Sequence, residues 1–473
     1  MNRHIFAMLF GGVLVLLMLA GGAFGADGWW NESWQYRRAI TINNENPHDL
    51  FDYQVRVVVP RFKGMNYNFS DIRFTYKFGD KEREIPYWIE NFAHENATVW
   101  VKVPCILKIS NTTIYMYYGN PSAQSESNGT ATFLFFDDFS TDTSSNYAVD
   151  NLFQQGGSIS YDSTNKRLEL TTSWVEGGTA GHNVFYYKGQ KFDKDVLVGS
   201  TIHFLDGGID MNGNGRSFKV ISRYVPGGSN PPARCAGFWE KSAWAPSEQA
   251  TISKDSRGDQ IINHTPYDYT EGETYTFRLG SVGQKSNFYI NDTFILSATS
   301  STGMSNGYVG WETYAANIAV DDIYVAKYTE SEPTVKIGVE QSQDFYISLN
   351  TNKANYSTGD VVNLVIEVNR MQENPQVMKF RLELEDLDEK PDTLIETGSF
   401  VMPAEFHKKV VLRFAIPESP FVPSGRYAFK AYLIEPSLGE VLAYDAVYFN
   451  VTEKEAKAKE QQSEAFAAFS LEE

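Results

Sequence analysis

Short runs in which apolar and polar residues alternate recur along the chain and predict β-strands rather than helices. Every second residue is apolar in the run 53–59, and the run 362–368 repeats the pattern. Successive side chains of a strand point to opposite faces, so each run offers one face to a buried core. Gly-Asn-Pro at 119–121 and Asn-Asp at 291–292 are turn signals, and the second of them predicts a tight hairpin. This rhythm predicts an all-β protein.

The length of 473 residues fits about three domains. We expect three consecutive β-sandwich domains at residues 26–130, 131–330 and 341–452. They follow a signal peptide at 1–25 and precede a charged tail at 453–473. The aromatic content of 14% favours packed sheets over helical bundles.

The N-terminus predicts export. A basic start is followed by an apolar run and small residues, which is the pattern of a secretory signal, and we expect cleavage before Ala26. The alternative is an uncleaved anchor, because the run is nearly long enough to span a bilayer. No second run of that length follows, so the mature chain is not expected to be integral to the membrane. The net charge of −18 argues against nucleic-acid binding and fits a soluble, solvated exterior with affinity for cations. The export signal predicts a secreted or cell-surface location.

Glycosylation triplets Asn-x-Ser/Thr support that location. They lie at Asn31, Asn68, Asn96, Asn111, Asn128, Asn263, Asn291, Asn355 and Asn450. The chain has 2 cysteines, Cys105 and Cys235, which fall in different predicted domains and are expected to be separate buried thiols.

The first domain carries a specific set of motifs. They are Trp34-x-Tyr36-Arg37-x-x-Ile40 and the segments 70–74, 86–90, 99–103 and 114–120. With these motifs the domain resembles a domain of unknown function that is widespread in secreted archaeal and bacterial proteins. The resemblance implies a β-sandwich without assigned activity, which commonly neighbours a lectin-like sandwich.

The second and third domains also resemble known families. Asp-Asp-Phe at 137–139, Tyr-Ile-Asn-Asp at 289–292, Gly-Tyr-Val-Gly at 307–310 and Asp-Asp-Ile-Tyr-Val at 321–325 follow one another as in concanavalin A-like (LamG-like) lectins and glucanases. This resemblance implies a jelly roll of two curved sheets. The segment 355–368 and its neighbours resemble immunoglobulin-like sandwiches of surface proteins.

Two pairs of adjacent aspartates bracket the second domain within otherwise apolar runs. They are Asp137 with Asp138, and Asp321 with Asp322. Carboxylates in core strands are costly unless a cation or hydrogen bonds compensate them. In the resembling sandwiches, acids on the first and last strands often hold calcium, which implies a structural calcium site with Asp138 and Asp322 as first choices. The alternative is that each pair ends a strand and faces water.

Sugar binding needs exposed aromatic rings beside polar groups. The candidates are Trp239, Trp244, Trp311, Tyr224, Arg223 and Glu240. The alternative for each tryptophan is a place in the core. The segment 210–215 matches the start of a calcium loop, but Ile221 stands where that loop needs a bidentate glutamate, so a hairpin is favoured.

Catalytic motifs are absent from the sequence. The Glu-x-Asp-x-x-Glu motif of the resembling glucanases does not occur between residues 135 and 329, and there is no His-Glu-x-x-His, Gly-x-Ser-x-Gly or phosphate loop. We therefore expect no enzyme, but a glycan-binding or adhesion protein whose partners are glycans or other cell-surface proteins. The alternatives are a self-assembling subunit of a surface layer or filament, and a glycan hydrolase with an unusual site.

Overall fold

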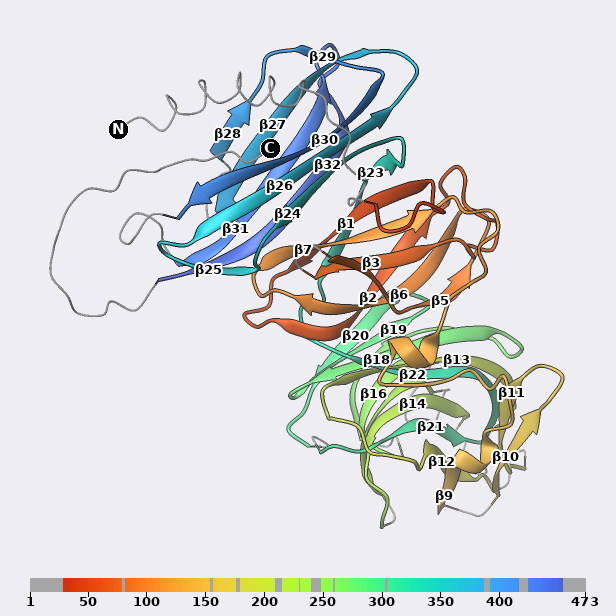
Figure 1. Ribbon diagram of the computed structural model, residues 1–473. Helices are drawn as coiled ribbons and strands as arrows, with labels where there is room; N and C mark the ends of the chain where they lie inside the picture. Colours follow the sequence, from red (N-terminus) through yellow and green to blue (C-terminus); the bar gives the residue numbers. More distant parts are fainter. Residues whose placement is uncertain are drawn as a thin grey trace, which may run out of the picture. The chain divides into compact units, whose positions relative to one another are not determined.

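The computed structural model forms two compact units (Figure 1). Unit 1 combines residues 1–128 with 333–473, and unit 2 is the continuous segment 129–332. The structure describes residues 29–78, 81–153, 156–175, 179–208, 215–228, 230–239, 248–257, 260–302, 305–386, 392–416 and 424–453. The predicted signal peptide and most of the predicted tail lie outside these residues.

Unit 1 is built of strands from both halves of the chain. They are β1 (Tyr36–Asn44), β2 (Leu50–Pro60), β3 (Arg73–Phe78), β4 (Lys81–Ile85), β5 (Tyr87–Phe92), β6 (Asn96–Ile106), β7 (Ser110–Tyr118), β23 (Thr334–Ser342), β24 (Phe345–Thr351), β25 (Asn355–Ser357), β26 (Val361–Met371), β27 (Gln376–Asp386), β28 (Asp392–Glu396), β29 (Phe400–Met402), β30 (Glu405–Ala415), β31 (Gly425–Glu435) and β32 (Glu440–Thr452).

One long sheet joins the two halves of unit 1. Its strand order is β30-β26-β24-β23-β1-β7-β3-β4, so β1 lies between β7 and β23. Tyr36 is opposite Tyr118 on one side and Ser342 on the other, and Figure 1 shows β1 and β23 side by side. The first and third predicted domains are therefore parts of one unit, and β23, most of which lies between the predicted second and third domains, connects them.

Two smaller sheets complete unit 1, and each encloses a core against part of the long sheet. The sheet β2-β6-β5 packs on β1, β7 and β3, and the sheet β25-β32-β31-β27-β28, with β29 beside β27, packs on β24, β26 and β30. The alternating runs explain these contacts, because Val55 and Val57 of β2 point into the first core, and Leu364 and Ile366 of β26 into the second.

Arg37 ties the two halves of unit 1 together between these cores. Its side chain is fully buried, and the guanidinium carbon lies 4.8 Å from the ring centre of Trp29, 4.7 Å from that of Tyr115 and 5.1 Å from that of Tyr346. It donates to Tyr117 Oη (3.0 Å), Gln341 Oε1 (3.2 Å) and the Ile347 carbonyl (3.3 Å). Asp445, also fully buried, accepts from Tyr115 Oη, Lys77 Nζ (3.1 Å) and the Leu349 amide (2.7 Å).

Unit 2 is a single sandwich. Its elements are α2 (Gly129–Thr132), β8 (Phe135–Asp137), the 3-10 helix η1 (Ser144–Asn146), β9 (Tyr147–Phe153), β10 (Gly157–Asp162), β11 (Arg167–Thr172), β12 (His182–Tyr187), β13 (Val196–Gly207), β14 (Ser217–Tyr224), β15 (Pro232–Trp239), β16 (Gln249–Asp255), β17 (Ile261–Pro266), β18 (Thr274–Val282), β19 (Lys285–Ile290), β20 (Thr293–Thr299), β21 (Tyr308–Tyr314) and β22 (Ala316–Lys327).

Two sheets of unit 2 face each other across an aromatic-rich core. One has the order β10-β11-β22-β13-β18-β19-β20, with β8 beside β22, and the other, the seven-stranded sheet, has the order β17-β16-β15-β14-β21-β12-β9. The core includes Phe218, Phe238, Phe277 and Trp311. The predicted hairpin is confirmed, because β19 and β20 are joined by Asn291 and Asp292 at φ values of 46° and 69°. The prediction of an all-β fold of sandwiches is confirmed.

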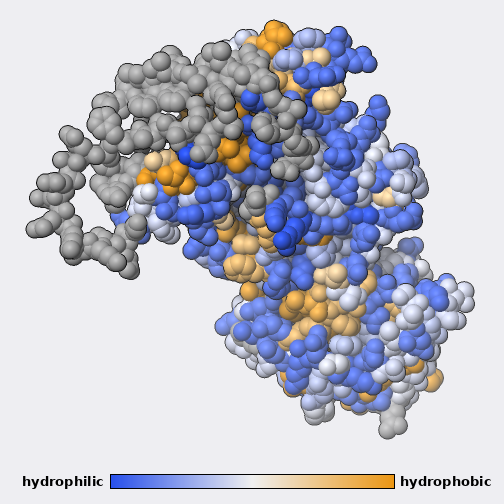
Figure 2. Space-filling view, viewed as in Figure 1, coloured by the Kyte–Doolittle hydropathy of each residue, from blue (hydrophilic) through white to orange (hydrophobic). Residues whose placement is uncertain are grey.

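One face of the molecule is mainly polar (Figure 2). Figure 2 shows a face on which hydrophilic residues predominate, interrupted by hydrophobic patches. Each asparagine of the glycosylation triplets is exposed or partly exposed. Cys105 and Cys235 are free thiols, as predicted, but only Cys235 is buried as expected, and Cys105 is partly exposed. Among the described residues no helix is long and apolar enough to cross a membrane.

Candidate functional site

The side of the seven-stranded sheet opposite to the core, which we call the outward face, carries a group of charged, polar and aromatic side chains. Alternation along β14 turns Phe218 and Val220 into the core and Lys219 outward. In β21 the core takes Val309 and Trp311, which leaves Glu312 on the outward face directly opposite Lys219.

A buried ion cluster occupies the middle of the outward face. Glu312 is fully buried, and its carboxylate lies 3.0 Å from Lys219 Nζ, 2.7 Å from His182 Nε2 and 3.1 Å from Ser217 Oγ. Lys219 Nζ also lies 2.6 Å from Ser217 Oγ. The three partners come from β12 and β14, so the cluster joins neighbouring strands of the sheet.

The cluster keeps Glu312 ionised. Burial by itself raises the pKa of a carboxyl group, but Lys219 and His182 outweigh it and lower the pKa of Glu312 below its ordinary value. A general acid in glycoside hydrolysis needs the opposite shift. Glu312 is therefore suited to holding its neighbours in place, and not to donating a proton.

Partly exposed tyrosine rings lie beside this cluster. The ring centres of Tyr186 and Tyr308 are 5.1 Å apart, and Tyr186 is also 5.1 Å from the buried Tyr224. The hydroxyl of Tyr224 donates to Asp150 Oδ2 on β9, and Lys191 Nζ lies 5.5 Å from the ring centre of Tyr308. Rings and charged groups thus share one end of the outward face.

A second aromatic group lies on the other side of the ion cluster. Tyr314 is opposite both His182 and Ser217, and Trp239 follows as the next partner of Ser217. Both rings are partly exposed. The rings of Tyr314 and His182 meet edge to face with centres 5.3 Å apart.

The structure separates the predicted sugar-binding residues. Trp239 and Tyr224 lie on the outward face, although Tyr224 is fully buried. Trp311 lies in the core with its Nε1 donating to Ser200 Oγ at 2.9 Å, so it is not available to a ligand. Arg223 is buried and donates to the Lys194 and Gly283 carbonyls, away from this face. Trp244 and Glu240 lie outside the described residues.

The aspartate pairs do come together. The first strand, β8, pairs with the last, β22, and Asp137 is directly opposite Ile323. Three of the four carboxylates accept hydrogen bonds from protein donors. Asp137 accepts from the Phe139 amide (3.1 Å), Thr143 Oγ1 (2.8 Å) and Tyr147 Oη (3.0 Å).

The carboxylate of Asp322 accepts from the amide (2.9 Å) and Oγ1 (3.1 Å) of Thr201. Asp138 is exposed and accepts from the Ser140 amide at 3.0 Å, and Asp321 lies 3.9 Å from His203 Nε2. In the described part of the chain, no group of three or more His, Cys, Asp or Glu side chains is placed to hold a metal. Calcium at the aspartate pairs, which would draw further oxygens from carbonyls and water, stays a prediction. The loop beginning at Asp210 lies outside the described residues.

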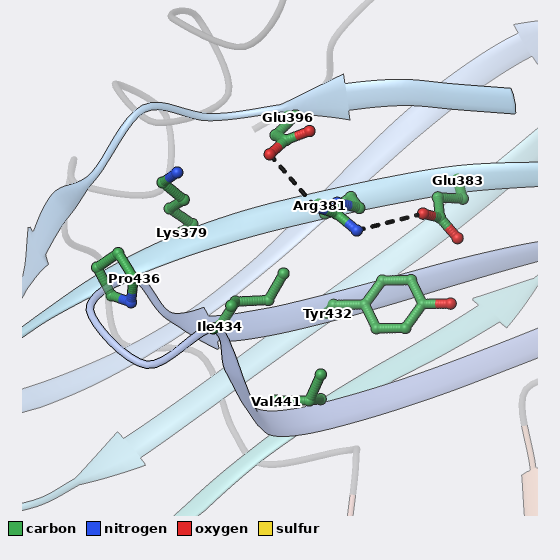
Figure 3. A pocket seen from close by; sticks show the side chains of 9 residues that line it. Lys379, Arg381, Glu383, Glu396, Tyr432, Ile434, Pro436 and Val441 are labelled. Carbon is green, nitrogen blue, oxygen red and sulfur yellow. Dashed lines mark hydrogen bonds and ion pairs between the residues drawn. The ribbon is translucent and has the colours of Figure 1, made fainter.

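A depression of about 320 Å³ lies in unit 1 on β27, β28, β31 and β32. Figure 3 shows Arg381 at its centre, with dashed lines to Glu396 and Glu383. These ion pairs measure 3.4 and 3.7 Å, so the charges of the depression already compensate one another. It offers a ligand little beyond solvent-exposed pairs, which contribute little to binding.

Comparison with known proteins finds a family for one segment. Residues 68–149 match a family described as a domain of unknown function, DUF2341. No curated protein matches the chain.

Solved structures resemble the chain at low identity. The carbohydrate-binding module CBM66 from Bacillus subtilis is 14% identical, with 38% of this chain and 95% of that chain covered and a TM-score of 0.29. A protein of unknown function with a galectin-like fold from Bacillus subtilis is 12% identical, with 41% and 96% covered and a TM-score of 0.33. A β-glucanase from Bacillus licheniformis is 9% identical, with 41% and 98% covered and a TM-score of 0.30. The sandwich architecture stands on the strand pairing described above and not on these likenesses.

Proposed function

We propose that the protein is a secreted or cell-surface glycan-binding protein that holds sugars on the outward face of unit 2. The observation that carries this proposal is the pair of partly exposed rings, Tyr186 and Tyr308, beside the carboxylate of Asp150. Sugar rings present apolar C–H faces and polar hydroxyl edges. Aromatic rings with adjacent hydrogen-bonding groups match both.

The ion cluster supports the proposal by making the face rigid. Lys219, His182 and Ser217 hold Glu312 between strands β12, β21 and β14. Side chains that are locked before binding lose little conformational entropy when a ligand arrives. Tyr186 lies on β12 and Tyr308 on β21, two of the strands that the cluster joins, so their rings keep their relative positions.

We propose binding without hydrolysis. A pair of carboxylates would have to divide the roles of acid and base. On the outward face, Glu312 and Asp150 are separated by β12, because each is opposite Val184 from a different side. Glu312 is paired with Lys219 and Asp150 accepts from the Tyr224 hydroxyl, which leaves neither carboxyl group poised for proton transfer.

Glycan-array binding by the full chain tests the proposal. We expect Tyr186→Ala and Tyr308→Ala each to weaken binding about tenfold, the loss that corresponds to about 1.4 kcal/mol for one stacking ring. Phe294→Ala is the matched control, because Phe294 is an exposed ring (54%) on the other sheet of the same unit.

Two results would contradict the proposal, one for the position of the site and one for the function. Equal losses in Phe294→Ala and the tyrosine variants would refute the placement of the site on the outward face. Absence of binding to any glycan by the wild-type protein would refute the function itself.

A further inference from the structure

Two buried arginines lie near one another at one end of the unit 2 sandwich. Arg234 on β15 is directly opposite Ser222 on β14, and the alternation with Ala236 and Phe238 turns its side chain toward the interior. Arg223 follows Ser222 at a φ of 56°, where the pairing of β14 with β21 is irregular. Arg234 is 0% exposed and Arg223 is 2% exposed.

Arg234 uses only part of its hydrogen-bonding capacity. Its Nη2 donates to the carbonyls of Ser300 (3.3 Å) and Thr302 (3.0 Å). Among the residues that the structure describes, its buried Nε and Nη1 have no acceptor, and the buried hydroxyl of Ser222, its neighbour across the strands, also has no partner. Unpaired buried donors are rare in folded proteins and usually mark a missing partner.

The two arginines differ in their counter-charges. Asp195 Oδ1 lies 3.6 Å from Arg223 Nη2, and Asp193 also acts electrostatically on Arg223. No carboxylate of the described residues is within ion-pair distance of Arg234. Burial, and then the neighbouring Arg223, lower the pKa of Arg234 to about 10. The guanidinium therefore still carries its proton at neutral pH, and a water molecule could satisfy its N–H groups but not neutralise it.

We propose that Arg234, with Arg223 and Ser222 beside it, binds a small inorganic anion of the size of chloride inside unit 2. The anion would accept from Nε or Nη1 of Arg234 and from the Ser222 hydroxyl, and would supply the counter-charge that Arg234 lacks among the described residues. Because Arg234 has no exposed surface, the site excludes the carboxylate or sulfate groups of a glycan. The anion is thus part of the folded unit and is independent of the proposed sugar site.

The test is the melting temperature of the full chain in sodium chloride, sodium bromide and sodium acetate at equal ionic strength. We expect the melting temperature of one unfolding transition of the wild-type protein to be about 3 °C higher in the two halides than in acetate. This is the shift expected for one site with the anion at roughly ten times its dissociation constant in a domain of this size. Arg234→Met should lose this difference. Arg278→Met is the control, because Arg278 is a buried arginine of the same unit that already has an ion pair with Asp292 at 2.9 Å, and it should keep the difference.

Crystals of wild-type protein grown with bromide give a second readout that does not depend on the folding of any variant. An anomalous bromide peak between Arg234 and Ser222 is the expected result. A water molecule at that position would overturn the proposal. So would a bromide peak without halide-dependent stability, which would mean an adventitious ion only.

Discussion

Replacement of Arg37 by methionine should destabilise unit 1 and leave unit 2 unchanged. Methionine preserves much of the side-chain volume but removes the guanidinium from its place among Trp29, Tyr115 and Tyr346. The three acceptors of Arg37 then lose their donor in the interior. Two of them, Gln341 and Ile347, lie in the second half of the chain, so the loss falls on the joint between the halves.

The magnitude follows from the contacts. A desolvated cation over an aromatic face contributes about 2 kcal/mol, and each hydrogen bond from a charged donor about 1.5–3 kcal/mol. These gains are offset by the cost of burying the charge in the first place. Removing one partner from a buried charge network costs about 3–5 kcal/mol, because the partners stay behind. Glu82, 3.8 Å from Arg37 Nη1, and the buried Asp445 would both lose positive charge nearby.

Hydrogen exchange read by mass spectrometry measures the effect unit by unit. We expect peptides from β24 and β32 of Arg37→Met to lose about 3–5 kcal/mol of protection, whereas peptides from β14 and β21 keep theirs. Arg37→Lys, which restores the charge without the planar fork, should recover only part of the loss. A change below about 1 kcal/mol in unit 1, or an equal change in unit 2, would refute the assignment of Arg37 as the joint.

Three further predictions concern unit 2 and the thiols. The pKa of Glu312 lies below its ordinary value of 4.5, so the ionised carboxylate of Glu312 stabilises the fold above pH 4.5, and this stabilisation is lost as the pH falls through the lowered pKa. The difference in melting temperature between wild type and Glu312→Gln should therefore be largest at pH 7 and shrink toward pH 3. If calcium binds at the aspartate pairs, chelation should remove about 2.7 kcal/mol of stability for calcium held at a hundredfold over its dissociation constant, and Asp138→Asn should abolish the effect; an unchanged melting curve would exclude the site. In the folded protein a maleimide should modify Cys105, which is partly exposed, and not Cys235, which is fully buried; mass spectrometry of the labelled peptides checks both.

The strands could be predicted from the sequence because their signal is local. The alternating runs 53–59 and 362–368 became β2 and β26, and Asn291-Asp292 gave the expected hairpin. The sequence carries no comparable local signal for which strands pair with each other. β23 pairs with β1 across about 300 residues of chain, and alternation says which face of a strand is buried but not which strand lies beside it. The joining of the two halves of unit 1 was therefore beyond reach.

The candidate site shows the same limit. The sequence indicated Trp239 and Tyr224, which do lie on the outward face, but it gave no reason to select Glu312. A single acid between Trp311 and Thr313 looks like an ordinary solvent-facing position. Its partners Lys219 and His182 are 93 and 130 residues away along the chain, and only the sheet brings them together. One available signal was Lys219 between the core residues Phe218 and Val220, because an isolated lysine in such a strand needs a counter-charge.

The strand order of unit 1 also sets the order in which the protein can fold during synthesis. Unit 2 is continuous in sequence, so it can complete its sandwich once residue 332 has left the ribosome. Residues 29–128 emerge earlier, but one edge of β1 stays unpaired, and Arg37 lacks its acceptors Gln341 and Ile347, until β23 and β24 are made. The unit that begins first is thus finished last, and for most of translation β1 presents an open strand edge, the kind of surface that pairs with other chains and recruits chaperones.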